Sequence, residues 1–442
     1  MEQFFAYIQS NAIVISSIIL ILAYIFIALE KIPKVTIALV GAAIVIFLGL
    51  ISQEKTLSNG LLNEHYFINF VDFNVIFLLV SMMIIVNITT RCGVFKWIAI
   101  ELLKMTKGHP LKVLVTLSFF TAILSAFLDN VTTVILVMPI TFVVCKLLDL
   151  NPIPLLIAEI FSSNIGGTAT LIGDPPNIII GSAAKFSFMN FLNELTIPCF
   201  IIMIVVLAFL YLCFKKDLKT TQEKMDSLQA IDNTKTITDK PLLKRSLTVL
   251  GLVILGFVTH DITHIATYLI AFIGAGFLLI FEKPEDIFKD VEWNTIFFFI
   301  GLFIIIGGFE AAGGIKLMAD WLLSVTKGSQ EITAVVMLWG SGILSGIIDN
   351  IPFTATMAPM LQEIQALKGA DYTYPLWWCL SLGACLGGNL TIIGAAANVI
   401  VSENAHKYGY DIPFMRFLKY GCIVVFISLS ISTAYIWIRH FI

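Results

Sequence analysis

The sequence predicts an all-α polytopic membrane protein of about ten transmembrane helices, arranged as two inverted five-helix repeats that each contain a re-entrant hairpin and a broken helix. Hydrophobic residues make up 58% of the 442 residues and charged residues 13%, whereas soluble domains carry about 25% charged residues. Two polar motifs each occur twice, about 220 positions apart, which is typical of transporters with internal repeats. Each half also contains an odd number of predicted crossings, so the two halves must have opposite orientations.

The first half is predicted to cross the membrane five times, and most of its apolar runs approach the roughly 20 residues that a crossing helix needs. The segment Val94–Met105 is short and has Lys96 and Lys104 near its ends, so we expect it to lie along the membrane surface. The stretches 111–128 and 131–148 are predicted to form the re-entrant hairpin. The crossings themselves are predicted at 12–30, 35–52, 73–90, 152–187 (the broken helix) and 192–214.

The second half follows the same order, with a second hairpin whose tip is Asp349-Asn350. The two repeats therefore occupy residues 1–214 and 246–442, and the polar stretch 215–245 between them is predicted to be a linker. The crossings of the second half are predicted at 246–260, 263–281, 294–312, 375–406 (the broken helix) and 413–438.

The distribution of basic residues predicts the orientation in the membrane. Lys31, Lys34, Arg91 and the many basic residues of the linker fall on one side of the predicted topology. The positive-inside rule makes that side cytoplasmic and places both termini outside, although Lys316 and Lys327 do not follow the rule. We expect an integral protein of a bacterial plasma membrane with a cytoplasmic linker. The net charge of −3 gives no indication of nucleic-acid binding.

The first repeated motif is LSAFLDNVTTVILVMP at 124–139, which returns as LSGIIDNIPFTATMAP at 344–359. A carboxylate at bilayer depth costs about 2.5–3.5 kcal/mol, yet Asp129 and Asp349 occupy matching positions and each is followed by Asn. Such a pair can cap a half-helix and can also supply oxygen ligands to a cation; capping alone is the structural alternative. A Na⁺ site would use Asp129, Asn130, Asp349 and Asn350, with Thr132, Thr133 and Thr354 beside them.

The second repeated motif is GGTATLIGDPPNII at 166–179, which returns as GGNLTIIGAAANVI at 387–400. The glycine pairs Gly166-Gly167 and Gly387-Gly388 are predicted to unwind a helix inside the membrane, so that free backbone groups line a cavity. Close packing of two helices is the alternative explanation of a glycine pair. The polar side chains expected to complete the site are Asn164, Thr168, Thr170, Asn177, Asn389, Thr391 and Asn398.

Two acidic residues have no counterpart in the other copy. Asp174 aligns with Ala395, and it either caps the helix that Pro175 starts or has a functional role. Glu159 aligns with Leu380 and is a candidate proton carrier. A carboxylate at the membrane boundary that faces water is the alternative interpretation of Glu159.

These motifs resemble those of the ion transporter superfamily. The stretches SNIGGTATLIGDPPNIIIG, LDNVTT, DNIPFTATMAPM and GGNLTIIGAAANVI are most similar to the group that contains arsenite permeases, D-type sodium–proton antiporters and the melanosomal P-protein. The resemblance implies a homodimer in which a transport domain, holding the hairpins and broken helices, moves against a scaffold in an elevator-like way. The superfamily's divalent-anion symporters carry Ser-Asn-Thr tips, and the Asp found here adds negative charge, which favours cation or proton handling over a dicarboxylate.

We therefore predict a secondary active ion transporter that moves a small ion coupled to Na⁺ or H⁺, with no other cofactor. Cation/proton antiport is favoured, with Asp129 and Asp349 binding Na⁺ or H⁺ alternately. One alternative is an anion or arsenite permease, because helix N-termini attract negative charge; a passive channel is another. A membrane enzyme is not expected, since the chain shows neither a nucleophile–base set nor a Cys/His metal-ligand spacing.

Overall fold

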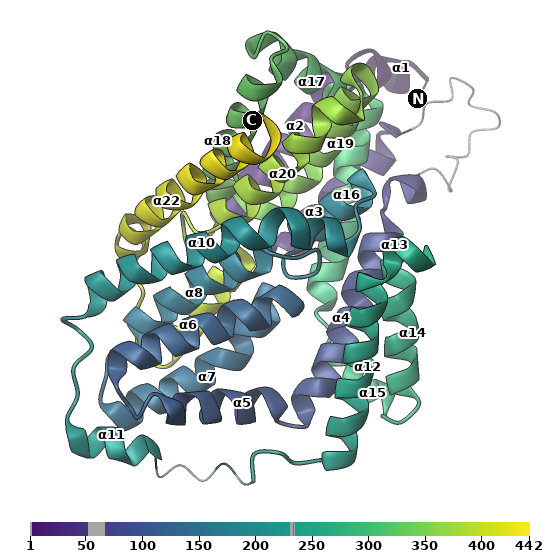
Figure 1. Cartoon of the computed structure of the whole chain (residues 1–442). Coiled ribbons are helices and arrows are strands. Elements are labelled where there is room, and N and C mark those ends of the chain that lie inside the picture. The colour runs from purple at the N-terminus through teal and green to yellow at the C-terminus, as the bar shows by residue number, and fades with distance from the viewer. Residues whose placement is uncertain (1, 52–66, 230–232, 234) are drawn as a thin grey trace.

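The structure is a computed structural model that describes residues 2–51, 67–229, 233 and 235–442, and its regular elements in those ranges are helices (Figure 1). The first repeat comprises α1 (Glu2–Ser10), α2 (Ala12–Leu29), α3 (Lys34–Phe47), the short 3₁₀ helix η1 (Phe67–Phe70), α4 (Phe73–Arg91), α5 (Val94–Met105), α6 (Pro110–Phe127), α7 (Asn130–Leu148), α8 (Ile153–Thr168), α9 (Pro175–Ala184) and α10 (Phe188–Phe214).

The linker contributes α11 (Gln222–Gln229). The second repeat comprises α12 (Lys240–Val258), α13 (His260–Thr263), α14 (Thr267–Leu279), α15 (Pro284–Phe288), α16 (Trp293–Ala311), α17 (Gly314–Val325), α18 (Gln330–Ile348), α19 (Asn350–Lys368), α20 (Ala370–Gly387), α21 (Ala396–Lys407) and α22 (Phe414–His440).

Nine of the described helices are long and apolar enough to cross a membrane: α2, α4, α6, α7, α10, α12, α16, α18 and α22. The prediction of an all-α polytopic membrane protein is confirmed. The hairpin helices α6, α7 and α18 have the length of full crossings, so their re-entrant character stays a prediction. The second predicted crossing, 35–52, ends where the described residues stop, since residues 52–66 lie outside them.

One pair of matching helices from the two sequence repeats lies at opposite ends of the molecule. Figure 1 shows both termini at one end and α5, α11 and α15 at the other. The matching surface helices α5 and α17 lie at opposite ends of the molecule, as expected for two copies of inverted orientation.

The helices pack in two groups that share one continuous hydrophobic core. In the first group, α16 packs on α3 and α14 packs on α4 and α12. In the second, α6 packs on α8, α18 on α20, and α19 on both α20 and α9. All residues of α8 are buried, so this apolar helix faces other helices throughout its length, whereas α2 exposes most of its apolar surface and is suited to contact lipid.

The glycine pairs allow helices to cross at short range, and the prediction that Gly166-Gly167 unwinds its helix is wrong. Both residues lie inside α8, which ends at Thr168. A Cβ atom on Gly166 would lie 2.1 Å from the carbonyl oxygen of Ala122 on α6, and one on Gly387 would lie 2.4 Å from that of Gly342 on α18. The first break begins after its glycine pair, at Ala169, whereas the second begins within its pair, because α20 ends at Gly387 and Gly388 is its C-cap. Gly166 and Gly387 each pass a neighbouring backbone at a distance that only glycine permits.

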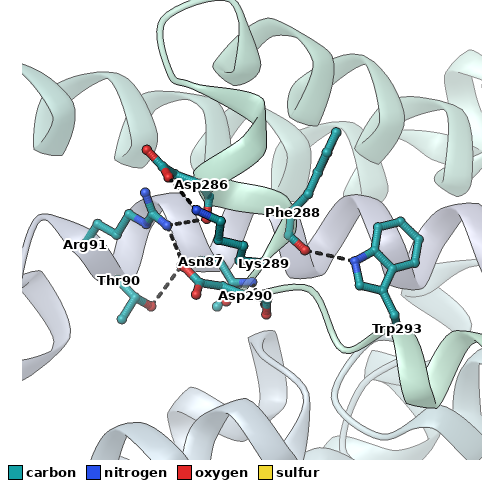
Figure 2. A network of polar contacts seen from close by, with 9 residues as sticks. Asn87, Thr90, Arg91, Asp286, Phe288, Lys289, Asp290 and Trp293 are labelled. Carbon is teal, nitrogen blue, oxygen red and sulfur yellow. Dashed lines mark hydrogen bonds and ion pairs between the residues drawn. The ribbon is translucent and has the colours of Figure 1, made fainter.

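A polar network joins the two repeats at the linker end of the molecule (Figure 2). Arg91 at the end of α4 donates to the Asp290 carboxylate and to the Asp286 carbonyl oxygen, both at 2.6 Å. Asn87, one turn earlier, donates to the Asp290 carbonyl oxygen at 2.8 Å. The α15–α16 turn of the second repeat is thereby held against α4 of the first.

The linker contains a helix of its own, and the helix that follows it begins before residue 246, where the first crossing of the second half is predicted. Helix α12 already begins at Lys240, because Asp239 caps it by accepting from the Leu242 amide at 2.8 Å. Helix α11 packs on α7, and Lys224 pairs with Asp149 at 2.5 Å. The hydrogen bond from this ammonium group lowers the pKa of Asp149. Residues 230–232 and 234 of the predicted linker lie outside the described residues.

The close helix crossing predicts a stability difference between two Gly→Ala substitutions. Gly166→Ala places a methyl group against the α6 backbone, which cannot rotate away, so we expect destabilisation of about 1–3 kcal/mol. Gly251→Ala on α12 is the control, since its Cβ would meet no atom within 4 Å and alanine favours the helix. Thermal unfolding in detergent should show a lower Tm for Gly166→Ala; equal melting temperatures for the two variants would contradict the packing argument.

Candidate ion-binding site

The two hairpin tips meet at one carboxylate, Asp174. Asn130, the first residue of α7, donates from Nδ2 to Asp174 Oδ1 at 3.2 Å. Asn350, the first residue of α19, donates to Asp174 Oδ2 at 3.2 Å and to Oδ1 at 3.4 Å. Asp174 is fully buried, and among the described residues no basic group lies within ion-pair distance of it. One carboxylate is therefore shared by asparagines from both repeats.

Local chain geometry explains why Asp174 is available for these contacts. It precedes Pro175, which starts α9 at a position that needs no N–H donor. Its backbone is extended and its side chain accepts no capping hydrogen bond. Asp174 thus occupies the N-cap position of α9 without a capping hydrogen bond from its side chain, and both carboxylate oxygens accept from the hairpin tips instead.

A chain of amides extends from Asp174 into the second broken helix. Asn164 on α8 accepts from Asn130 at 3.4 Å and donates to Asn389 Oδ1 at 2.9 Å and to Asn398 Oδ1 at 3.0 Å. The Nδ2 atom of Asn389 is buried and has no hydrogen-bond partner among the described residues. A buried, unpaired donor is costly, so this atom is available to a bound group.

Two matching asparagines brace the broken helices against each other. Asn177 donates to the carbonyl oxygens of Thr168 and Thr170 in its own break, at 3.0 and 2.8 Å, and accepts from Ser381 on α20 at 2.6 Å. Asn398 donates to the Gly388 and Thr391 carbonyl oxygens in the second break, at 2.7 and 2.9 Å, while its own oxygen accepts from α8. The free carbonyl groups of each break therefore accept hydrogen bonds from an asparagine of the same repeat, as backbone polar groups inside a membrane require. The side-chain oxygen of the same asparagine accepts a hydrogen bond from a helix of the other repeat.

The threonines predicted as ligands are engaged in holding the breaks. Thr170 donates to the Ala126 carbonyl oxygen, and Thr391 donates to the matching Gly346 carbonyl oxygen at 2.6 Å. Thr168 donates to the Asn164 carbonyl oxygen one turn earlier in α8, at 2.6 Å. Their hydroxyl groups stabilise the framework around Asp174 in this conformation.

The tip aspartates Asp129 and Asp349 cap their half-helices. Asp129 accepts from the Thr132 amide at 2.9 Å and from the Thr132 hydroxyl at 2.5 Å. Asp349 accepts from the Ile351 amide at 3.1 Å and pairs with Lys34 at 3.1 Å. The capping geometry is present at both tips, and the adjacent asparagines, rather than the aspartates, converge on Asp174.

Three further predicted residues are buried beside these elements. One oxygen of Glu159 accepts from Thr141 on α7, and the other has no partner among the described residues. The hydroxyl groups of Thr133 and Thr354, near the two tips, are likewise buried and unpaired. No hydrogen bond links any of the three side chains to Asp174.

Several neighbours of the site were not predicted. Ser163 donates to the Asn130 carbonyl oxygen at 3.3 Å, and Cys385 lies 3.5 Å from the Asn177 side-chain oxygen. Ser163 directly precedes Asn164 in the stretch SNIGGTATLIGDPPNIIIG, and this position could have identified it from the sequence. Cys385 gave no signal, because an isolated cysteine in an apolar segment is usually a small packing residue.

The arrangement is better suited to binding one small ion than to coordinating a metal ion through several acidic, histidine or cysteine side chains. Among the described residues no group of three His, Cys, Asp or Glu side chains could hold a metal ion. The site combines one carboxylate with amide groups and with the N-termini of α7, α9, α19 and α21. Carboxylate and amide oxygens bind hard cations, whereas amide donors and helix N-termini favour anions.

Comparisons with known proteins identify relatives of this architecture. Residues 24–383 match the family described as citrate transporter, CitMHS. A 46 kDa membrane protein of Mycobacterium leprae is 40% identical over 97% of this chain and 99% of its own length, and an uncharacterized transporter of Mycobacterium tuberculosis has the same identity and coverage. The P protein of Sus scrofa is 31% identical over 97% of this chain and 59% of its own length.

A solved structure shares the fold. The YdaH transporter of Alcanivorax borkumensis superposes with a TM-score of 0.56 at 13% identity, over 94% of this chain and 98% of its own. Together with the sequence relatives, this confirms the predicted resemblance, and the family and its named members are transporters rather than enzymes.

The asparagine braces predict a stability effect at the second break. Asn398→Ala leaves the Gly388 carbonyl oxygen without the amide that it accepts from and removes one of two partners from the Thr391 carbonyl oxygen and from the Asn164 amide. An unpaired buried group costs about 1–3 kcal/mol. Asn404→Ala on the same helix α21 is the control, since it removes only a half-buried bond to the Ile400 carbonyl oxygen. Asn398→Ala should show the lower Tm in detergent; if the two variants melt together, the brace does not stabilise the break.

Proposed function

The chain belongs to the CitMHS citrate transporter family, and from this premise we propose that it is a secondary active transporter that exchanges a small cation for protons at Asp174. The observation that carries the proposal is the sharing of one buried carboxylate by the two tip asparagines. A carboxylate buried away from basic groups gains free energy when it binds either a proton or a cation. Because the two ions need the same oxygens, their competition couples opposite fluxes.

The helix grouping supports an elevator-like movement. Helices α6–α9 and α18–α21 hold the hairpins, the breaks and Asp174, and they form the proposed transport domain. Helices α2–α4 and α12–α16 pack on one another and form the proposed scaffold. We place the protein in a bacterial plasma membrane as a homodimer, with the linker on the cytoplasmic side.

Anion transport is the second candidate, and one observation favours it. The buried Nδ2 atom of Asn389 has no partner, and it lies in an amide network beside several helix N-termini, where a carboxylate or oxyanion would be stabilised. The family's description as citrate transporters agrees with this chemistry. A coupled cation would then offset the charge of Asp174. An arsenite permease would be one form of this anion-transport alternative.

The proposal predicts cation-dependent proton movement in liposomes. Purified protein is reconstituted with a pH-sensitive dye inside acid-loaded vesicles, and Na⁺, Li⁺ or K⁺ is added outside with the membrane potential clamped. We expect one or more cations to alkalinise the lumen. Asp174→Asn should abolish this signal, because a neutral amide cannot exchange a proton for a cation. Asp217→Asn, an exposed change in the linker, should leave it unchanged.

The tip aspartates provide a second comparison in the same assay. Asparagine caps helices about as well as aspartate, so Asp129→Asn and Asp349→Asn keep the half-helices. If both variants lose transport while Asp174→Asn retains it, the ion binds at the tip carboxylates and the assignment to Asp174 is wrong. Silence with every cation, followed by uptake of labelled citrate or arsenite, would establish the anion alternative.

A further inference from the structure

A groove lies between α5, α6 and α10 at the linker end of the molecule (Figure 1). The end of α5, the start of α6 and the last turn of α10 line it, and its volume is about 540 Å³. Apolar side chains such as Met105, which is 77% exposed, share this lining with His109, Lys112 and Tyr211. None of the residues that line the groove belongs to the network around Asp174.

The positive charge of the groove has no anionic partner. Lys112 is the third residue of α6, where the partial positive charge of the helix N-terminus disfavours a cation. The first turn of α6 contains no acidic residue, and His109 before it makes no capping bond. Lys112 is exposed and forms no ion pair in the parts of the chain that the structure describes, while Glu101 on α5 already pairs with Lys104. A negative group in the groove would offset this charge.

The matching positions of the second repeat carry a different charge. The offset of 220 residues aligns Leu111 and Lys112 with Glu331 and Ile332. Glu331 lies in the first turn of α18, where an acidic side chain is favourable, and α17 beside it lies at the opposite end of the molecule from α5 (Figure 1). The repeated framework therefore does not require a lysine here, and of the two copies only the one at the linker end carries it.

The surroundings of the groove favour a lipid over a soluble anion. The linker helix α11 covers the turn between α5 and α6, since Gln229 donates to the Lys104 carbonyl oxygen at 2.6 Å and a Cβ atom on Gly108 would lie 2.7 Å from the Met225 carbonyl oxygen. Beside the groove, Met105 and Leu212 expose apolar side chains, which in a membrane protein are suited to acyl chains. The groove thus combines an apolar lining with an unpaired cation near the membrane surface, where headgroup phosphates lie.

We propose that the groove binds an anionic phospholipid of the leaflet on the linker side, which the basic residues predict to be cytoplasmic. The headgroup phosphate lies against Lys112 and His109, and an acyl chain lies along Met105 and Tyr211. Because α6 belongs to the proposed transport domain, the bound lipid joins that domain to one leaflet. The site is separate from Asp174, so it goes beyond the proposed ion exchange and does not depend on which ion is carried.

Lipid titrations of the purified full-length protein test this site. Protein in dodecyl maltoside is mixed with increasing mole fractions of dioleoylphosphatidylglycerol, with dioleoylphosphatidylcholine as the reference, and the rise in Tm gives the half-saturating mole fraction. Lys112→Gln should raise that mole fraction about fivefold, the effect of one lysine near an anionic surface. Lys112→Arg keeps the charge and should match the wild type.

Two further variants separate the groove from the rest of the basic surface. Lys146→Gln is the matched control, because Lys146 is an exposed lysine near the linker end of α7 that does not line the groove; its half-saturating mole fraction should equal that of the wild type. Met105→Glu adds a negative charge at an exposed position. It should weaken the response to phosphatidylglycerol without lowering the Tm measured in detergent alone.

Each other outcome overturns the proposal. Equal responses of Lys112→Gln and Lys146→Gln would mean that the lipid is attracted by the whole basic surface and not by the groove. Stabilisation by phosphatidylcholine as strong as that by phosphatidylglycerol would rule out recognition of an anionic headgroup. Inorganic phosphate that stabilises the protein as well as the lipid does would assign the groove to a soluble anion. Stabilisation by none of the three would remove the site altogether and leave the ion exchange at Asp174 to its own assay.

Discussion

The structure depends on one constraint: a carboxylate, Asp174, is buried where the two repeats meet. A buried charge without a cation costs several kcal/mol unless polar groups surround it, and asparagine side chains from both hairpin tips donate to Asp174. Both asparagines are the first residues of hairpin helices, so the two hairpin tips must lie at the same depth as the helix breaks. The breaks in turn expose backbone groups, which Asn177 and Asn398 satisfy. The polar framework of the molecule therefore follows from placing this one side chain.

Most of the fold could be predicted from the sequence, because its signals are local. The apolar lengths gave helix positions close to those observed, and the Asp-Asn pairs marked the first residues of α7 and α19 correctly. The failures involve partners distant in the chain. Gly166 could either interrupt its helix or allow another helix to pack closely against it, and the second role depends on Ala122, which lies on a different helix. The role of Asp174 depends on Asn350, 176 positions away, and that of Lys34 on Asp349, 315 positions away. The sequence indicated the region of the site and named Asp174 as a candidate, but it did not predict that the asparagines of both hairpin tips contact this carboxylate.

The chemistry arises where the two repeats differ. Their framework contacts are nearly identical, as the pairs Thr170–Ala126 and Thr391–Gly346 illustrate. The charged residues break this symmetry: Asp174 matches Ala395 in the alignment, and Lys34, the first residue of α3, matches Thr267, the first residue of α14. A symmetric framework supplies two equivalent half-sites, which suits movement between two sides of a membrane. One unmatched acid then sets the charge of the site, and one unmatched base distinguishes the two hairpins.

The central claim is that a cation and a proton compete for Asp174, and proton release tests it most directly. The purified protein is placed in weakly buffered detergent solution with a pH-sensitive dye, and the cation that drives proton movement in liposomes is added. Binding to a protonated carboxylate must displace its proton, so the wild type should release about one proton per bound cation and Asp174→Asn should release none. Equal release from the two proteins would contradict the account.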